Sequence, residues 1–258
     1  MKKSDKRCAF CFQDNKLTRE HIWPEGILKR LPTYRGRFSE KADKVIAGDL
    51  IIKDVCITCN SGVLSELDAY GCLLFDKYFH EVAEPDTELR FEYDYDNLFR
   101  WLLKIAYNTA RSSANPNLSL LRPLTPYILG QSARPSEMEL YLDAVTHSMI
   151  PTIHGPKKFP ATAFRSARVV GVPPLPDWCV VRLVSINSFY FYILLFEKIY
   201  RESDDLAKVR RSIKGVLVPP ENASLTLPHS TTGAFEVHKD HMLSNLDEYR
   251  KFFRGDSN

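Results

Sequence analysis

Two pairs of cysteines at the spacing of metal ligands stand near the start of this 258-residue chain. Cys8 and Cys11 form the run CAFC, and Cys56 and Cys59 form the run CITC. Each C-x-x-C pair places two thiolates on one tight turn, which suits a tetrahedral zinc ion. We therefore predict a structural Zn²⁺ site at these four residues, and ordinary buried cysteines are the simpler alternative.

A glutamate and a histidine stand side by side between the two pairs, in the run LTREHIWP. Taken alone, Glu20 is most simply a solvated charge, and His21 is most simply a structural histidine at the end of a strand. Zinc bound to both cysteine pairs would clamp the ends of the intervening segment together. Glu20 and His21 would then lie close to the second pair. We predict that Ile22 and Trp23 are core residues behind them.

The segments around this pair have the patterns of two strands and a helix. Residues 17–22 and the β-branched run 49–55 (DLIIKDV) predict two paired strands. Apolar or small residues then recur every three or four positions, which predicts a helix from near Asn60 to a point before Pro85. These residues are Leu64, Leu67, Gly71, Leu74 and Tyr78.

The order of these motifs resembles the HNH family of His-Me finger (ββα-metal) endonucleases. That order is C-x-x-C, then EHIxP, then C-x-x-C-N at the start of a helix, over about residues 5–80. The run VCITCNSGVLSELD also resembles a branch of the family with CN-G-x-x-S-x-L-E/D after the second pair. The resemblance implies a zinc-framed ββα-metal (HNH) module at the N-terminus. It also implies hydrolysis of phosphodiester bonds in nucleic acid, with DNA favoured over RNA.

The resemblance further implies a role for each matching residue. His21 matches the general base that takes a proton from the attacking water. Glu20 matches the acidic ligand of a catalytic Mg²⁺ or Mn²⁺ ion, and Asn60 matches the polar residue that completes the ion site. These residue types suit the roles, because imidazole exchanges protons near neutral pH and hard cations prefer oxygen ligands. Asp54 is a further candidate, either to brace His21 or to contact the ion.

Other functions remain open at this point. Asn60 could serve only as a helix N-cap, which is a common use of asparagine. The whole module could be a zinc-stabilised domain that binds nucleic acid or protein without catalysis. It could also be a subunit of a larger complex, silent until a partner protein assembles.

Two groups of basic residues are candidates for contact with a phosphate backbone. In the amphipathic helix predicted over residues 98–111, Arg100, Lys104 and Arg111 share one stripe. The second group is the run KVRRSIK, and it contains Lys208, Arg210, Arg211 and Lys214. A solvated helix face and an ordinary charged surface are the alternatives for the two groups.

The rest of the chain predicts a mixed α+β domain. Four segments have strand character, and helix 98–111 is expected to pack on their antiparallel sheet: Met138–Val145, Ala167–Val172, Cys179–Ile186 and Phe189–Phe196. We predict a hairpin turn at residues 187–188 and a last helix over residues 239–253.

We divide the chain into an HNH module over residues 1–84 and an α+β accessory domain over residues 85–258. The second domain could select the substrate, form a homo-oligomer or bind a partner protein. Stand-alone proteins of the resembled family with an added domain often belong to restriction or anti-phage defence systems.

The bulk composition sets only wide limits on function. The net charge of +3 neither requires nor excludes a polyanionic partner. The most apolar run, residues 189–196, is too short to cross a bilayer, and the N-terminus has no apolar segment typical of a signal peptide. We therefore expect a cytoplasmic protein without a membrane partner, in which reduced cysteines are available to bind metal.

Overall fold

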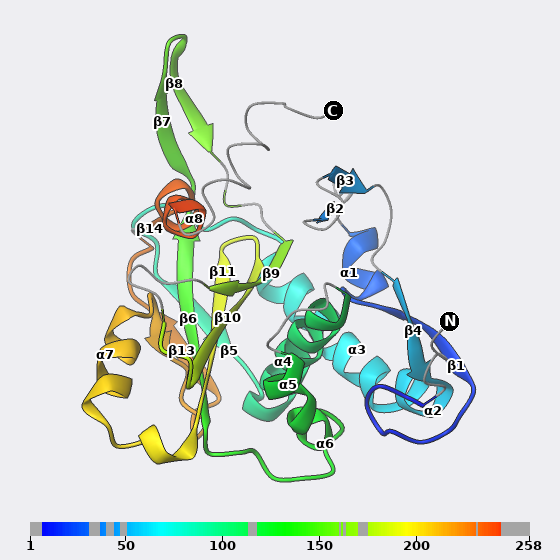
Figure 1. The fold of residues 1–258 in the computed structure, drawn as a ribbon. Coiled ribbons are helices and arrows are strands. Elements are labelled where there is room, and N and C mark those ends of the chain that lie inside the picture. The colour runs from blue at the N-terminus through cyan, green and yellow to red at the C-terminus, as the bar shows by residue number, and fades with distance from the viewer. Residues whose placement is uncertain are drawn as a thin grey trace. The chain divides into compact units, whose positions relative to one another are not determined.

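The chain forms two compact units that alternate along the sequence. The computed structural model describes residues 7–30, 37–39, 44–46, 51–112, 118–159, 161, 164–169, 175–230 and 232–243 (Figure 1). Residues 1–75 and 96–135 form the first unit, and residues 76–95 and 136–258 form the second. Both units combine helices with antiparallel strands, which agrees with the predicted α+β class.

The first unit holds the segments that the sequence singles out. Its elements are β1 (Leu17–His21), α1 (Glu25–Lys29), β2 (Arg37–Ser39), β3 (Lys44–Ile46), β4 (Ile51–Cys56), α2 (Ile57–Cys59), the π-helical turn η2 (Asn60–Leu64), α3 (Ser65–Leu74), nearly all of α4 (Tyr95–Ser112), α5 (Leu118–Leu121), the 3-10 turn η4 (Arg122–Leu124) and α6 (Thr125–Ile128). Two strand pairs are antiparallel, β1 with β4 and β2 with β3.

The β1–β4 pair and the helix that follows it match the predicted order of elements. Glu20 lies opposite Ile52, and His21 lies opposite Ile51 at the last position of β1. A β-bulge interrupts the pairing between Thr18 and Glu20. Helical backbone then begins at Ile57, three residues before the predicted start. The N-cap interpretation requires Asn60 to be the residue just before the helix. Asn60 instead lies inside the helical segment, so that interpretation is wrong.

Helix α4 is the central helix of the first unit and is buried on nearly every side. The apolar residues that the sequence assigns to its inner face, Phe99, Leu102, Leu103 and Ala106, are all fully buried. The predicted domains placed this helix in the second domain, on the antiparallel sheet. The structure instead groups it with the N-terminal residues, and its Lys104 pairs there with Glu20 and Asp68. The compact units therefore do not follow the predicted boundary at residues 84 and 85.

Helices α3 and α4 approach closely where Gly71 faces Trp101. A Cβ atom at Gly71 would overlap the indole ring of Trp101, which is fully buried. We expect Gly71→Ala to destabilise the protein by about 1–3 kcal/mol, because the tightly packed helices must separate. Chemical denaturation measures this loss, and an unchanged midpoint would contradict the packing of these two helices.

The second unit is built on a six-stranded sheet. Its main path runs β12 (Val216–Leu217), β6 (Met138–Thr146), β11 (Phe189–Phe196), β10 (Cys179–Ile186) and β9 (Phe164–Val169), and β14 (Thr232–Gly233) pairs with β6 in parallel. The predicted turn at residues 187–188 is confirmed, since it connects β10 and β11 and Asn187 has a φ of 47°. Three of the four predicted strands are confirmed closely, and β9 begins three residues earlier than predicted.

The remaining elements of the second unit surround this sheet. They are the π-helical turn η3 (Phe75–Phe79), β5 (Leu89–Glu92), β7 (Ser148–Thr152), β8 (Gly155–Phe159), the 3-10 turn η5 (Lys198–Tyr200), α7 (Asp204–Ser212), β13 (Ser224–Leu227) and α8 (Ala234–Leu243). Helix α8 begins five residues before the predicted last helix, whose residues 244–253 lie outside the described part. Among the described residues, no helix combines the length and apolar character needed to cross a membrane.

Candidate functional site

The four cysteines predicted to bind zinc lie together in the first unit. The sulfur atoms of Cys8, Cys11, Cys56 and Cys59 are all within 4.8 Å of one another. Cys11 Sγ and Cys56 Sγ are 3.7 Å apart. A tetrahedron with Zn–S bonds of about 2.3 Å has sulfur–sulfur edges of about 3.8 Å. The cluster therefore fits one tetrahedral Zn²⁺ ion.

Short local elements hold these sulfurs in place. The first pair lies on a tight turn in which the amide of Phe12 donates to Cys8 O at 3.0 Å, and Phe12 has a positive φ of 59°. The second pair lies where β4 ends and α2 begins. The backbone amide of Cys56 donates to Cys8 Sγ at 3.3 Å, which links the two pairs.

The electrostatics of the cluster favour a bound cation. Burial opposes ionisation of Cys8, but backbone amides outweigh it, so the pKa of this thiol is below its usual value. Burial raises the pKa of Cys11, and burial together with the neighbouring cysteines raises the pKa of Cys59. Four thiolates at these distances repel one another, so full ionisation of the set needs a metal ion.

An open pocket lies at the end of β1, also within the first unit. Its volume is about 320 Å³, and its lining includes Glu20, His21, Asn60, Ser65, Asp68 and Cys72. The structure thus brings together the three residues that the resemblance assigns to catalysis. His21 is half-buried here. Neighbouring residues of a strand point to opposite faces, and both can border this pocket because β1 ends at His21.

Asn60 connects the start of the helical segment to β1. Its Nδ2 donates to Thr18 Oγ1 at 2.9 Å and to the backbone oxygen of Arg19 at 2.7 Å. A carbonyl oxygen can only accept, so the amide nitrogen must face β1. The amide oxygen of Asn60 is then the atom that a ligand in the pocket could use.

Glu20 is held by a buried lysine. Its side chain is 3% exposed, and Oε1 lies 2.6 Å from Nζ of Lys104, which is fully buried in α4. The same ammonium lies 2.6 Å from Oδ1 of Asp68 on α3. This burial corrects the prediction that Lys104 belongs to a surface stripe for phosphate contact, because its charge is turned into the first unit. Arg100 of the same predicted stripe is half-buried, and its Nε donates to Ile128 O at 3.0 Å.

Asp54 is not among the residues that line the pocket. Its Oδ1 lies 2.5 Å from Nη1 of Arg111, the third residue of the predicted stripe. The guanidinium of Arg111 also lies over the rings of Phe10 and Tyr107, at 5.2 and 4.8 Å from their centroids. The suggested contact of Asp54 with a catalytic ion is thus not supported, because its carboxylate pairs with Arg111, which lies against Phe10 between Cys8 and Cys11.

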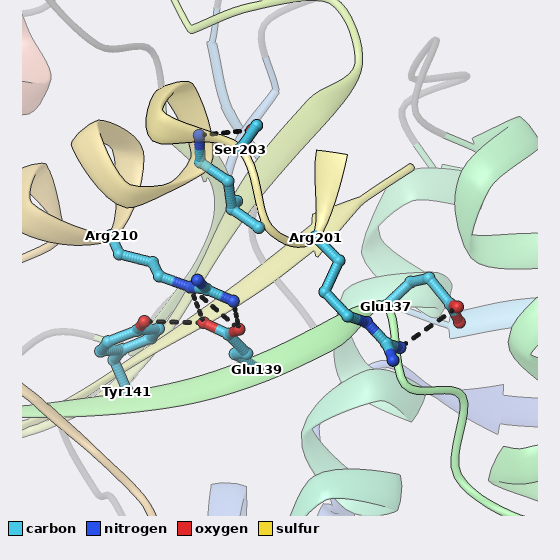
Figure 2. Close-up of polar contacts among 7 residues, drawn as sticks. Glu137, Glu139, Tyr141, Arg201, Ser203 and Arg210 are labelled. Atoms are coloured by element: carbon cyan, nitrogen blue, oxygen red, sulfur yellow. Dashed lines mark hydrogen bonds and ion pairs between the residues drawn. The ribbon is translucent and has the colours of Figure 1, made fainter. Parts of the chain in front are cut away.

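The second basic group, on and after α7, is divided by its contacts in the second unit. Figure 2 shows the guanidinium of Arg210 joined to Glu139, with Nη2–Oε1 at 2.5 Å and Nε–Oε1 at 3.1 Å. Tyr141 donates to the same carboxylate at 2.7 Å. The guanidinium of Arg210 therefore serves a structural ion pair with Glu139. Lys208, Arg211 and Lys214 are exposed, and Lys208 pairs with Asp205 at 2.8 Å, so contact with a polyanion stays a prediction for these three.

We expect Arg210→Ala to lower the free energy of unfolding by about 1 kcal/mol, the upper end for a partly exposed ion pair. The reason is its forked contact with Glu139. The matched control Arg211→Ala, one position along α7, removes an exposed side chain and is expected to change stability by less than about 0.5 kcal/mol. Equal losses of stability for the two variants in urea denaturation would contradict a structural role that Arg210 has and Arg211 lacks.

Sequence reasoning did not assign roles to Asp68 or Asn108. Asp68 lies in the run SELD that contributes to the resemblance. Its position on the helix after the second cysteine pair is the signal that could have indicated a place in the pocket. Asn108 Nδ2 donates to Glu20 Oε1 at 3.3 Å. Nothing local in the sequence indicates this contact, since 88 positions separate the two residues.

Comparisons of this chain with protein-family models, curated proteins and solved structures found no match. The chemistry of the residues themselves therefore indicates what each site can bind. The cysteine cluster fits zinc in donor type and spacing. The pocket offers carboxylate and amide oxygens, which suit Mg²⁺ or Mn²⁺, although the ammonium of Lys104 already neutralises part of that charge.

Proposed function

We propose that this chain is a metal-dependent endonuclease of the HNH type that hydrolyses phosphodiester bonds in nucleic acid. The observation that carries the proposal is the pocket that Glu20, His21 and Asn60 line together in the unit that holds the four-cysteine cluster. These residues come from segments 40 positions apart, and their presence in one pocket supports the roles that the resemblance implies. The site would work in the cytoplasm, where zinc can bind reduced thiols.

His21 supplies the proton chemistry in this proposal. Its imidazole accepts a proton from a water molecule as that water attacks phosphorus, and the leaving 3′ oxygen receives a proton from solvent. The half-buried position at the end of β1 keeps the ring in place and open to the pocket. Glu25, four residues on, also borders the pocket and interacts electrostatically with His21.

Glu20 and the amide oxygen of Asn60 would hold the catalytic ion. A Mg²⁺ or Mn²⁺ ion bound there supplies positive charge that stabilises the phosphate and the leaving oxygen. Asn60 has a second task, because its amide nitrogen fixes the start of the helix against β1. Both oxygen donors thus belong to elements that the zinc cluster holds together.

A turnover assay separates this function from a binding module without catalysis. Zinc-loaded protein is mixed with an excess of plasmid DNA, and separately with RNA, with and without added Mg²⁺. The nuclease predicts that cut product exceeds the amount of protein only when Mg²⁺ is added. The binding module predicts complexes that form equally well without Mg²⁺ and no product from either nucleic acid.

The choice between DNA and RNA is an outcome of the same assay. DNA is the favoured substrate, on the resemblance to HNH endonucleases. A role in restriction or anti-phage defence, with a partner protein, is the wider setting that this resemblance suggests. Cleavage of RNA alone would keep the chemistry and change the substrate.

A further inference from the structure

Lys104 is a buried ammonium ion in the middle of helix α4. Its side chain has no exposed surface, and a charge in that position is costly unless oppositely charged groups surround it. Glu20 and Asp68 provide those groups, each with one oxygen 2.6 Å from Nζ. Burial alone would lower the pKa of Lys104, but the two carboxylates outweigh it and raise the pKa above its usual value. Nζ of Lys104 therefore has an acidic partner from each of two different elements.

The three charges come from three different elements of the first unit. Glu20 lies in β1, Asp68 in α3 and Lys104 in α4. Two carboxylates that share one ammonium lie close together, and both border the pocket beside His21. Burial raises the pKa of Asp68, and the charge of Glu20 adds to the rise while Lys104 opposes it. Lys104 is thus the one cation that contacts both carboxylates among the described residues.

The contacts of Glu20 also orient its carboxylate. Lys104 and Asn108, one helical turn apart on α4, both contact Oε1. Asn108 is itself held by Arg111, whose Nη2 donates to Asn108 Oδ1 at 2.5 Å. Among the described contacts of Glu20, Oε2 is the oxygen left to face the pocket. Polar side chains of α4 therefore fix the orientation in which the carboxylate of Glu20 faces the pocket.

We propose that Lys104 is a positioning residue for this pocket, and that it holds Asp68 beside Glu20 as a second carboxylate of the ion site. The inference rests on the proposed function for its catalytic part. It makes α4, which lies outside the segment that resembles a nuclease, an integral part of the site. The charge of Lys104 offsets one of the two carboxylates, so the pocket stays folded before a divalent ion arrives.

The structural part is tested by thermal unfolding of Lys104→Met. The buried carboxylate of Glu20 and the half-buried carboxylate of Asp68 would lose their shared cation, which is expected to lower the unfolding midpoint by roughly 10 °C. Added Mg²⁺, or the second change Glu20→Gln, is expected to restore part of this loss. The matched control Lys208→Met removes an exposed lysine from a similar ion pair and is expected to leave the midpoint unchanged. Strictly additive effects of Glu20→Gln and Lys104→Met would overturn the proposal.

The ion site is tested with Asp68→Asn, which keeps the pair of Lys104 with Glu20. The Mg²⁺ concentration that gives half-maximal cleavage is expected to rise roughly tenfold or more, because one oxygen donor has lost its charge. Lys104→Arg, which keeps the charge, is expected to fold more stably than Lys104→Met and to recover part of the cleavage rate. An unchanged Mg²⁺ titration for Asp68→Asn would show that this carboxylate has no part in ion binding.

The two proposals fail in different ways. The coupling between Glu20 and Lys104 in unfolding experiments needs no substrate, so it is measured even when no nucleic acid is cut. If the wild-type protein cuts neither DNA nor RNA while the Glu20→Gln and Lys104→Met variants show the coupling, the nuclease is overturned and the positioning of Glu20 is supported. If the wild-type protein cuts but the variants show no coupling, the role of Lys104 is overturned and the nuclease is kept.

Discussion

Replacing His21 with alanine is expected to reduce Mg²⁺-dependent cleavage by about 10²–10⁴-fold, the usual contribution of a general base. This corresponds to roughly 3–5 kcal/mol of activation free energy. The change is expected to leave the fold intact, because His21 is half-buried at the last position of β1. A smaller side chain there enlarges an open pocket and creates no closed cavity.

His80→Ala is the matched control for that change. His80 lies in the second unit, where its side chain is 46% exposed and pairs only with Glu81 among the described contacts. The control is expected to cut at the wild-type rate. The comparison is made by single-turnover cleavage at equal zinc content. A His21→Ala protein that cuts as fast as the control would remove His21 from the mechanism.

Loss of zinc is expected to unfold the segment that carries the pocket. Structural Zn²⁺ sites of four cysteines contribute on the order of 10 kcal/mol to the folding of small modules. Here the cluster joins the turn of Cys8 and Cys11 to the end of β4, and Tyr107 of α4 donates to Ala9 O at 2.8 Å in that turn. Disorder of the turn would therefore also loosen α4, which holds Glu20.

The change Cys59→Ser tests this dependence. It is expected to reduce the bound zinc from one ion per chain to a small fraction and to lower the unfolding midpoint sharply. Cys179→Ala changes a buried cysteine of the second unit, outside the cluster, and is expected to keep one zinc per chain. Metal analysis after gel filtration measures both. Equal zinc in the two variants would show that the cluster is not the zinc site.

The parts of the fold that depend on local spacing could be predicted from the sequence. The two C-x-x-C pairs predicted a cluster that the structure contains, since ligand spacing within a turn is a local property. The strands β1 and β4 and the hairpin of β10 and β11 followed from β-branched and apolar runs and from a turn at residues 187–188. The burial of Ile22 and Trp23 was also predicted and is confirmed.

The role of α4 could not be predicted, for a physical reason. Helical periodicity shows that Arg100, Lys104 and Arg111 lie near one stripe, but it does not show what faces that stripe. A lysine is ordinarily an exposed residue, and only the two acidic partners brought in by β1 and α3 make its burial favourable. These partners lie 84 and 36 positions away in the chain, beyond any local pattern.

We propose that a zinc-framed pocket around Glu20 and His21 cuts nucleic acid. The most direct test measures zinc content and cleavage in one sample of purified protein. The claim predicts one zinc per chain, with cleavage of DNA or RNA that begins when Mg²⁺ or Mn²⁺ is added. A fully zinc-loaded protein that cuts neither nucleic acid with either ion would contradict it.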